Sequence, residues 1–348
     1  PTDFSGAIRI GGTAGDWMWK GGQGAPSALV GGTLHPFEFM PELFYGIKFA
    51  ESGNRLEIVD EVLEELYKAE ADHDDVPFYY RFQYGKPIIR VHEAVEDGED
   101  SYHQFGLRRE TLDPQQSVFS QRKDPDIYPE ITATAKRFGE IQIFREWGFG
   151  RSSALRLAQS ANLPTDVLLP QLVNLGLVLN DLEHRPVWDR FNKLMTAFLP
   201  RYKRLSTKVS AGSVQIFLHE DGLSAPVPAT RLSDGTLRFL ALLAILLNPE
   251  SASLICIEEP ELGLHPDAVS LLAELLTEAS EKTQVIVTTH SDGLVSALTE
   301  QAESVLVCDY GDNGTEMRRL EAEKLKFWLE KYRLGEVWRI GKLGGNLW

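Results

Sequence analysis

Reactive side chains stand at the ends of two apolar segments in the last third of the chain. Residues 254–258 read LICIE and are followed by Glu259, and residues 284–289 read QVIVTT and lead to His290. One carboxylate can hold a divalent metal while its neighbour orients and deprotonates a water molecule that attacks a phosphate. A histidine beside them can donate a hydrogen bond to that phosphate. These residue types therefore indicate metal-assisted phosphate hydrolysis.

A third element, RLSDGT at residues 231–236, precedes an apolar segment at 237–247. We call it the Ser233 loop. A serine, a glycine and the start of a helix together offer a hydroxyl, free backbone N–H groups and the positive end of a helix dipole, which favours anions. Taken alone, this loop is also compatible with an ordinary helix cap. Likewise, the paired glutamates alone are compatible with a solvated strand end, and the histidine alone is compatible with a structural role. The three motifs together favour a functional site.

The elements around these residues predict how they are positioned. Apolar strands alternate with helices at 237–247 and 266–280, which is typical of parallel βαβ units covered on both faces. In such sheets, ligands bind beyond the carboxyl ends of the strands. Because one crossover helix separates the two strands, we expect their ends to be near neighbours. Residues 304–309 predict a further strand of this lobe, and Cys256 and Cys308 are expected inside core strands.

The first two thirds of the chain have a different pattern. Residues 1–36 are rich in glycine. Residues 37–66 predict an antiparallel hairpin with a tight turn at 52–54, and residues 77–95 predict a second hairpin around Gly85 and Lys86. A polar connection follows at 96–125, and apolar residues at helical spacing occupy 163–199. We therefore expect three parts: an antiparallel β part at 1–95, a polar connection and helical insertion at 96–210, and a lobe carrying the reactive residues at 211–348.

Bulk properties restrict the class of protein. The 348 residues are 43% hydrophobic and 25% charged, and 51 acidic residues against 35 basic ones give a net charge of -16. This balance argues against broad, nonspecific coating of nucleic acid. The apolar run at 237–247 is too short to span a membrane, and two cysteines provide no metal-ligand spacing or disulfide framework. We expect a cytoplasmic protein without a membrane partner.

Two further features have a simpler explanation than a nucleic-acid site. The segment VCDYGDNG, with Asp309 and Asp312, favours a hairpin turn over part of a metal-dependent nuclease. A basic cluster near a predicted helix end favours a solvated face over a DNA-binding patch. Its members are Arg190, Lys193, Arg201, Lys203, Arg204 and Lys208.

The order and spacing of the motifs resemble the RecF-like and SMC-like branch of ABC-type ATPases, with the bacterial AAA-family ATPases grouped with RecF. RLSDGT is similar to their signature loop, LICIEEPE to their Walker B strand with its catalytic carboxylate, GLHP to their D-loop and TTHS to their switch-histidine loop. The segments QQSVFSQRKDP, FREWGFGR and LGEVWRIGKLGGN extend the resemblance over nearly the whole chain.

This resemblance implies an α/β fold, the ABC-type head of a P-loop NTPase. Its mostly parallel sheet would be flanked by helices, with an antiparallel β subdomain and a helical insertion. It also implies ATP and Mg²⁺ as cofactors, and a homodimer whose heads close on two ATP molecules. By position, Glu258 would hold the metal, Glu259 would be the general base and His290 the γ-phosphate sensor. The partner's ATP would be capped by Ser233, Asp234, Gly235 and Thr236.

The sequence also departs from the family pattern. Glu258 replaces the usual Asp, while Asp234 and Thr236 replace Gly and Gln of the signature, so an acid would lie beside the triphosphate. No G-x-x-x-x-G-K-[ST] motif occurs in the 348 residues. We therefore expect an N-terminally incomplete copy that lacks a strand and its phosphate loop. The sheet should then show a gap, or a substitute strand, between the strands that end in Glu259 and His290.

Three functions remain open at this point. The first is ATP hydrolysis that opens and closes a head dimer in DNA repair or genome maintenance, with DNA or a repair protein as partner. The second is the ATPase component of a bacterial anti-phage defence system with an effector partner. The third is a non-hydrolysing interaction module that keeps the fold, and the coding sequence upstream of Pro1 would discriminate it from the others.

Overall fold

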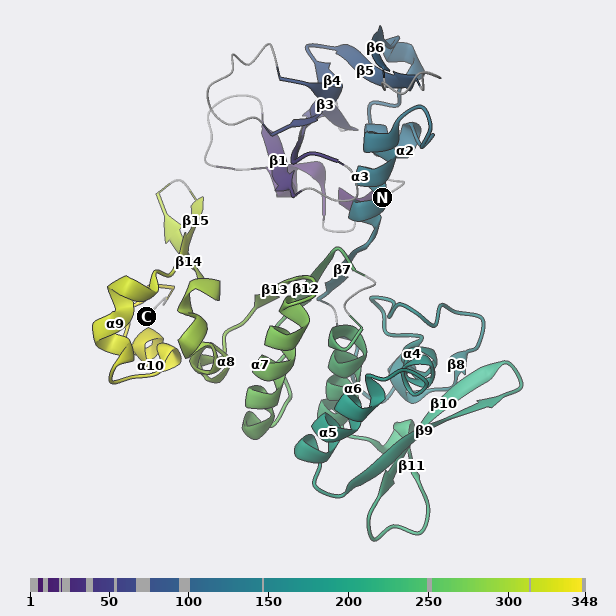
Figure 1. The fold of residues 1–348 in the computed structure, drawn as a ribbon, viewed down its shortest axis with the longest axis vertical. Coiled ribbons are helices and arrows are strands. Elements are labelled where there is room, and N and C mark those ends of the chain that lie inside the picture. Colours follow the sequence, from purple (N-terminus) through teal and green to yellow (C-terminus); the bar gives the residue numbers. More distant parts are fainter. Residues whose placement is uncertain are drawn as a thin grey trace. The chain divides into compact units, whose positions relative to one another are not determined.

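The computed structural model describes residues 6–8, 12–18, 20, 26–35, 40–52, 55–66, 76–93, 101–145, 147–248, 252–312 and 314–345. The chain forms two compact units, residues 1–139 and 140–348 (Figure 1). Each unit is described by itself. The three-part division expected from the sequence stays a prediction.

The first unit is built on a six-stranded antiparallel sheet whose strands pair in chain order. The strands are β1 Ser27–Leu34, β2 Leu43–Ser52, β3 Arg55–Glu65, β4 Phe78–Gln83, β5 Lys86–Glu93 and β6 Ser101–Gly106. Both predicted hairpins are confirmed. Tyr84 and Gly85 both have positive φ, at 52° and 75°, as a two-residue turn between right-twisted strands requires. The turn expected at residues 52–54 falls partly on 53–54, outside the described residues.

Short helices complete the first unit. α2 (Val118–Gln121) and α3 (Pro129–Gly139) place Phe119 and Ile131 against Leu43, Leu63 and other buried residues of the sheet. Residues 96–125 were expected to be a polar connection, but within them β6 pairs with β5, and α2 forms close to their end. Ser117 starts α2 by accepting a hydrogen bond from the Phe119 N–H at 3.2 Å.

The second unit contains a three-stranded parallel sheet in the order β13-β12-β7. Its strands are β7 Ile141–Phe144, β12 Leu254–Glu258 and β13 Gln284–Thr288. β12 and β13 pair directly, from Leu254 opposite Gln284 to Glu258 opposite Thr288. The prediction of a gap or a substitute strand between β12 and β13 is therefore wrong. Strands joined by a single crossover helix usually pair with each other, which is the arrangement found here.

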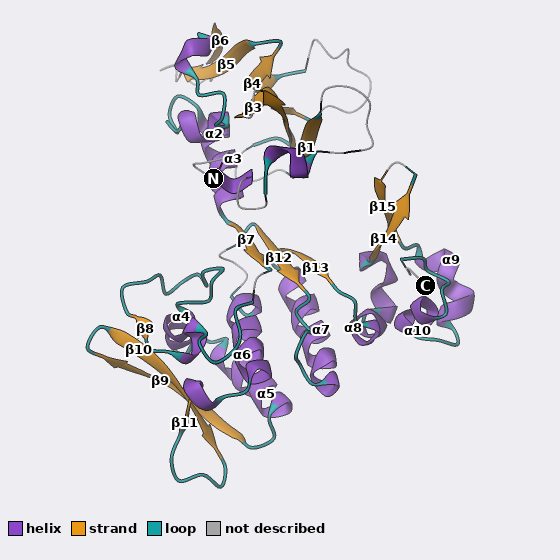
Figure 2. Ribbon diagram, turned by 180° about the vertical axis from the view of Figure 1, so that it is seen from behind, coloured by secondary structure: helices purple, strands orange, loops and turns teal. Residues whose placement is uncertain are grey.

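Helices α6 (Asp234–Leu246) and α7 (Pro266–Ser280) cover one face of this sheet (Figure 2). α6 is buried from Leu237 to Leu246, which explains why its sequence is apolar on all sides. On the opposite face, Ile143 and Ile286 flank Cys256 and remain 51% and 47% exposed. Within the described residues, the expectation of a sheet covered on both faces is therefore not met.

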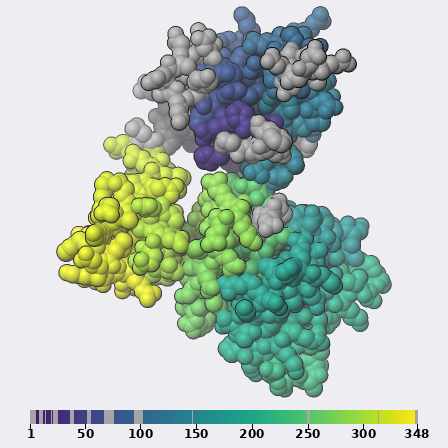
Figure 3. Space-filling view, in the orientation of Figure 1, coloured from purple at the N-terminus to yellow at the C-terminus, as the bar shows by residue number. Residues whose placement is uncertain are grey.

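The insertion before α6 is a mixed layer of short helices and strands. It contains η3 Ala154–Arg156, β8 Gln159–Ser160, α4 Leu175–Leu182, α5 Trp188–Phe198, β9 Tyr202–Ser210, β10 Ser213–Glu220, β11 Val227–Pro228 and η4 Ala229–Arg231. Buried side chains of α4, α5 and β10 belong to one hydrophobic core, and this part of the chain is the teal region of the space-filling view (Figure 3). Within this layer, β10 pairs antiparallel with β8, β9 and β11.

The helix predicted from residue 163 instead begins at Leu175. Asn174 explains the difference. Its amide donates to the carbonyls of Pro164 and Val167 at 2.8 Å and accepts from the Leu169 N–H at 2.9 Å. The segment before α4 is thereby held as a loop, and local side-chain bonds of this kind compete with helix formation.

The C-terminal part continues through α8 Asp292–Ala297, η6 Thr299–Ser304, β14 Leu306–Gly311, β15 Gly314–Arg319, α9 Ala322–Leu329 and α10 Leu334–Arg339. β14 pairs antiparallel with β15, so the hairpin predicted around Asp309 and Asp312 is confirmed and β14 does not extend the parallel sheet. Cys308 is consequently exposed, contrary to expectation, whereas Cys256 is partly buried. The chain is mixed α/β, but among the described strands antiparallel pairing predominates.

Candidate functional site

The Ser233 loop forms the capped start of α6. The Ser233 hydroxyl oxygen accepts from the Thr236 N–H at 3.0 Å and lies 2.8 Å from the Thr236 hydroxyl. This cap satisfies one of the free N–H groups of the first turn. Ser233 and Asp234 are exposed, and the first turn of α6 carries further backbone N–H groups and the positive end of the helix dipole. Its use as an anion site stays a prediction.

Gly235 places this loop against the turn that follows β12. A Cβ atom at Gly235 would lie 2.8 Å from the carbonyl oxygen of Gly263, which is closer than real Cβ atoms approach. Gly263 itself has a φ of +78°, the left-handed region that favours glycine. The two glycines thus permit a close backbone contact between the Ser233 loop and the GLHP segment.

Arg156 fixes the other side of the Ser233 loop. Its guanidinium forms an ion pair with Asp234 and donates to the carbonyls of Leu232 at 2.5 Å and Ala229 at 3.3 Å. Its Nε donates to the Gly150 carbonyl at 2.8 Å, and the Gly150 N–H reaches Asp234 at 3.3 Å. The negative charge of Asp234, a departure from the family pattern, is therefore paired within the chain.

The two glutamates follow β12 in different backbone conformations. Glu258 ends the strand with an exposed side chain, while Glu259 has a φ of +44°, which is unusual for a residue with a side chain. Such left-handed residues cost on the order of 1–3 kcal/mol and persist where surrounding contacts hold them. Here the Glu259 N–H donates to Thr288 at 2.9 Å, and its carbonyl accepts from Leu262 N–H and Arg238, both at 3.1 Å.

The structure brings Glu259 and His290 together. Their carboxylate oxygen and Nε2 are 3.8 Å apart, and the side chain of His290 is 87% exposed. The prediction that the ends of the two strands are neighbours is confirmed by the pairing of Glu258 with Thr288.

Further residues of this edge were not identified from the sequence. Glu261 accepts a hydrogen bond from the Thr289 hydroxyl, and Thr289 in turn accepts from the Ser291 N–H at 3.0 Å. The second carboxylate oxygen of Glu261 is buried and has no hydrogen-bond partner among the described residues. The motif EEPE carried a signal for Glu261, because it places a third carboxylate two residues after Glu259.

Arg238 and Trp147 were also missed as site residues. Arg238 is 6% exposed, and its guanidinium carbon lies 5.1 Å from the ring centre of Trp147 and 4.7 Å from that of Phe149. Burial lowers the pKa of Arg238, while the nearby carboxylates of Glu261, Asp234 and Glu259 oppose this shift. An arginine inside an otherwise apolar helix segment was the available signal.

The donor set fits Mg²⁺ bound together with a nucleotide. No group of three or more His, Cys, Asp or Glu side chains among the described residues forms a metal site of its own. Mg²⁺ usually keeps several waters and takes one or two carboxylates plus substrate phosphates, and the exposed Glu258 could be such a carboxylate. The ion would neutralise charge on the phosphate oxygens when bound.

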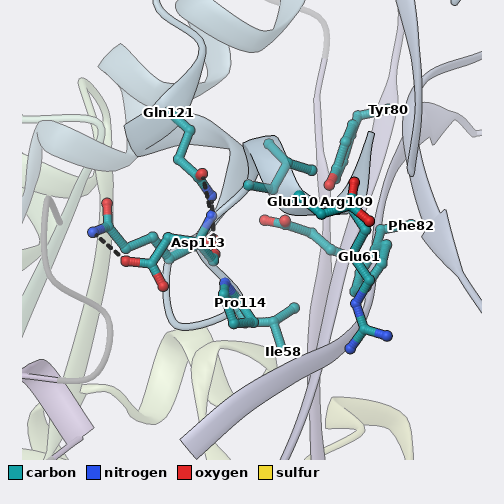
Figure 4. Close-up of a pocket in the computed structure, with 11 residues that line it drawn as sticks. Ile58, Glu61, Tyr80, Phe82, Arg109, Glu110, Asp113, Pro114 and Gln121 are labelled. Carbon is teal, nitrogen blue, oxygen red and sulfur yellow. Dashed lines mark hydrogen bonds between the residues drawn. The ribbon is translucent and has the colours of Figure 1, made fainter. Parts of the chain in front are cut away.

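A cavity of about 300 Å³ lies in the first unit. Tyr80 and Phe82 of β4 line one side, and Asp113 and Pro114 line the other (Figure 4). Glu61 also lines it, but its carboxylate accepts from Tyr45, Ser117 and the Val118 N–H. Burial raises the pKa of Glu61 and these bonds oppose the shift. Glu61 therefore serves to hold α2 on the sheet.

The basic cluster considered for DNA is partly neutralised. Arg190 pairs with Glu274 at 2.5 Å and Glu278 at 2.9 Å, and Arg201 pairs with Glu220 at 3.2 Å. Ion pairs of this kind agree with a solvated face. Of the helices that the structure describes, none is long and apolar enough to cross a bilayer.

A family model described as "AAA domain, putative AbiEii toxin, Type IV TA system" matches residues 46–296. The match covers both glutamates, the Ser233 loop and His290. The chain belongs to this family.

Individual proteins show more limited similarity. The Old nuclease of Escherichia phage P2 is 32% identical over 127 residues, which is 33% of this chain and 21% of the nuclease. The chain thus matches about a fifth of that relative's length. An SMC head domain from Thermotoga maritima is 14% identical with a TM-score of 0.33, covering 80% of this chain and 74% of that one. An SMC head domain from Pyrococcus furiosus is 13% identical with a TM-score of 0.39, covering 83% and 80%.

Proposed function

We propose that this protein hydrolyses ATP, with Glu259 as the general base. The observation that carries the proposal is the conformation of Glu259. It is held in a left-handed backbone at the carboxyl end of β12, with its carboxylate 3.8 Å from His290. Uncommon backbone conformations cluster at active sites, where the surrounding contacts fix a reactive side chain.

Each residue of the site has a distinct task in this proposal. Glu259 accepts a proton from the attacking water, and His290 donates a hydrogen bond to the γ-phosphate. Glu258 provides the carboxylate for Mg²⁺, as argued above. Glu261 and Thr289 join the two strand ends through their hydrogen bond and so preserve the spacing between Glu259 and His290.

The Ser233 loop acts on the ATP of a second copy of the chain in this proposal. The free N–H groups of α6 and the hydroxyls of Ser233 and Thr236 are suited to γ-phosphate oxygens. Pairing of Asp234 with Arg156 supports the assignment, because it reduces the repulsion expected between this acid and a triphosphate. A homodimer with two ATP molecules between its heads follows.

The comparisons favour a setting in bacterial defence over DNA repair. The family description names a toxin of a type IV toxin–antitoxin system, and the Old nuclease is a phage protein. In this setting, ATP-driven opening and closing of the dimer would control an effector partner. A repair role with DNA as partner is the second possibility.

Hydrolysis by the protein expressed from its full gene tests the proposal. Glu259→Gln should reduce turnover by roughly 10²–10⁴ while ATP binding persists, because the amide cannot take up a proton. Glu274→Gln, on the exposed side of α7, is the matched control and should leave turnover unchanged. If wild-type protein and E259Q release phosphate at the same rate, Glu259 is not the base. Absence of hydrolysis by the wild type would favour the non-hydrolysing module.

A further inference from the structure

Two consecutive backbone carbonyls at the candidate site accept hydrogen bonds from a pair of side chains that contact each other. The Glu258 carbonyl accepts from the indole N–H of Trp147 at 3.1 Å, and the Glu259 carbonyl accepts from the guanidinium of Arg238 at 3.1 Å. The guanidinium carbon of Arg238 lies 5.1 Å from the ring centre of Trp147. One contacting pair thus fixes both peptide groups from which the two carboxylates extend.

The burial of Arg238 needs an explanation beyond packing. A charged group out of water is costly unless rings, carbonyls or carboxylates compensate it. Here the rings of Trp147 and Phe149 and the Glu259 carbonyl provide that compensation. An apolar side chain of similar volume would often be equally stable at such a position. The arginine therefore indicates a task that requires its donors.

That task concerns the backbone of Glu259. Three hydrogen bonds hold this residue in the left-handed region. Its N–H donates to the Thr288 carbonyl, and its own carbonyl accepts from the Leu262 N–H and from the Arg238 guanidinium. The first connects it to the neighbouring strand β13, and the second to its own turn. The third connects it to α6, whose first turn is the Ser233 loop. Arg238 lies four residues after Asp234 and so on the same side of α6.

We propose that Arg238 is a positioning residue that makes the placement of Glu259 depend on the position of α6. The inference rests on the proposed function. Since the Ser233 loop would bind the partner's ATP while Glu259 acts on ATP of its own protomer, Arg238 links the two ATP sites of the dimer. Occupation of one site then affects turnover at the other, which is a coupling between distinct sites.

Steady-state kinetics and ATP binding of full-length protein test this role. Arg238→Met keeps the volume and removes the donors. It should lower kcat by about 10- to 100-fold, since a small misplacement of a reacting group has effects of this size. The Kd for ATP should stay within about threefold, because the loss falls on the transition state. The dependence of rate on ATP concentration should lose its cooperativity.

Three further variants isolate the effect. Arg238→Lys keeps a cation on the rings and should recover part of kcat. Trp147→Phe removes the donor to Glu258 and should reduce kcat less than Arg238→Met does. Arg81→Met in the first unit is the matched control, because Arg81 also lies over a ring, 4.4 Å from the centre of Phe78, and pairs with Glu64. It should leave kcat unchanged.

Some results would overturn the inference. A kcat for Arg238→Met within about twofold of wild type would do so, as would a fall in kcat matched by an equal loss of ATP affinity. If Arg238→Met does not fold, the other two variants decide. The inference is overturned if Arg238→Lys and Trp147→Phe both keep the wild-type kcat and the wild-type cooperativity. Inactive wild-type protein removes the proposed function itself, whereas active wild type with unaffected variants removes only the role of Arg238.

Discussion

Asp234 and Arg156 form an ion pair in which the aspartate is part of the Ser233 loop and the arginine belongs to the separate turn η3. The side chain of Arg156 is 10% exposed, against 54% for Asp234. The same guanidinium also binds the carbonyls of Leu232, Ala229 and Gly150. An acid that looked unfavourable beside a triphosphate is thus the anchor point for a largely buried arginine that shapes the loop.

Arg156→Ala is expected to impair the Ser233 loop more than the fold. It leaves the exposed Asp234 charge unpaired and removes several donors to loop carbonyls, a loss of about 1–3 kcal/mol for charged hydrogen bonds. ATP-dependent dimerisation, measured by light scattering with the E259Q variant, should weaken markedly. Arg156→Ala combined with Asp234→Ala should recover part of it. Equal dimerisation of Arg156→Ala and the parent would contradict this role.

Gly235→Ala tests the close contact with the turn after β12. The added Cβ would meet the Gly263 carbonyl at 2.8 Å, so α6 or the turn must shift. We expect a loss of about 1–3 kcal/mol in the free energy of unfolding, as for other overpacked sites, together with weaker dimerisation. Gly139→Ala is the control, since nothing lies within 4 Å of a Cβ built there and its stability should change little. Similar melting temperatures for the two variants would count against the contact.

Ser233→Arg tests whether the Ser233 loop acts on a partner's nucleotide. The loop is exposed, so a long side chain fits without unfolding the monomer but would occupy the space of the phosphates. The ATP-induced dimer seen by light scattering with E259Q should disappear, while ATP binding by the monomer remains. Ser213→Arg, at the start of β10, is a control outside the proposed interface. An ATP-induced dimer that survives Ser233→Arg would exclude the action in trans.

The elements of the site were predictable from the sequence because local signals define them. Pro266 marks the start of α7, Ser233 caps α6, and short apolar runs give β12 and β13. These signals also placed Glu259 and His290 at one edge of the sheet. Local rules sufficed here because consecutive strands joined by a helix usually pair.

Other features depend on partners that are distant in the chain. β7 joins the parallel sheet beside β12 although more than a hundred residues separate them, and β14 pairs with β15 instead of entering that sheet. No periodicity encodes such pairings. The same holds for Arg156 and Trp147, whose contacts with Asp234 and Glu258 exist only after the chain has folded.

The conformation of Glu259 leads to a prediction about stability and function. A residue with a side chain at φ +44° is less favourable than glycine, by about 1–2 kcal/mol for the left-handed region. Glu259→Gly should therefore be more stable than Glu259→Ala, by about 1 kcal/mol in the free energy of unfolding. At an ordinary helical or extended position the order would be reversed, because glycine loses more backbone entropy on folding.

Both variants should lose turnover alike, since each lacks the carboxylate. Stability would be followed by urea denaturation monitored through tryptophan fluorescence, and turnover by phosphate release. The matched pair Glu274→Gly and Glu274→Ala, within helix α7, should show the opposite order of stability, because alanine favours a helix over glycine by about 1 kcal/mol. If Glu259→Gly is less stable than Glu259→Ala, Glu259 does not hold a strained backbone in solution. If Glu259→Gly is the more stable variant, the protein retains a destabilising residue at the position whose carboxylate lies beside His290. Such an arrangement is expected where function, and not packing, determines the residue.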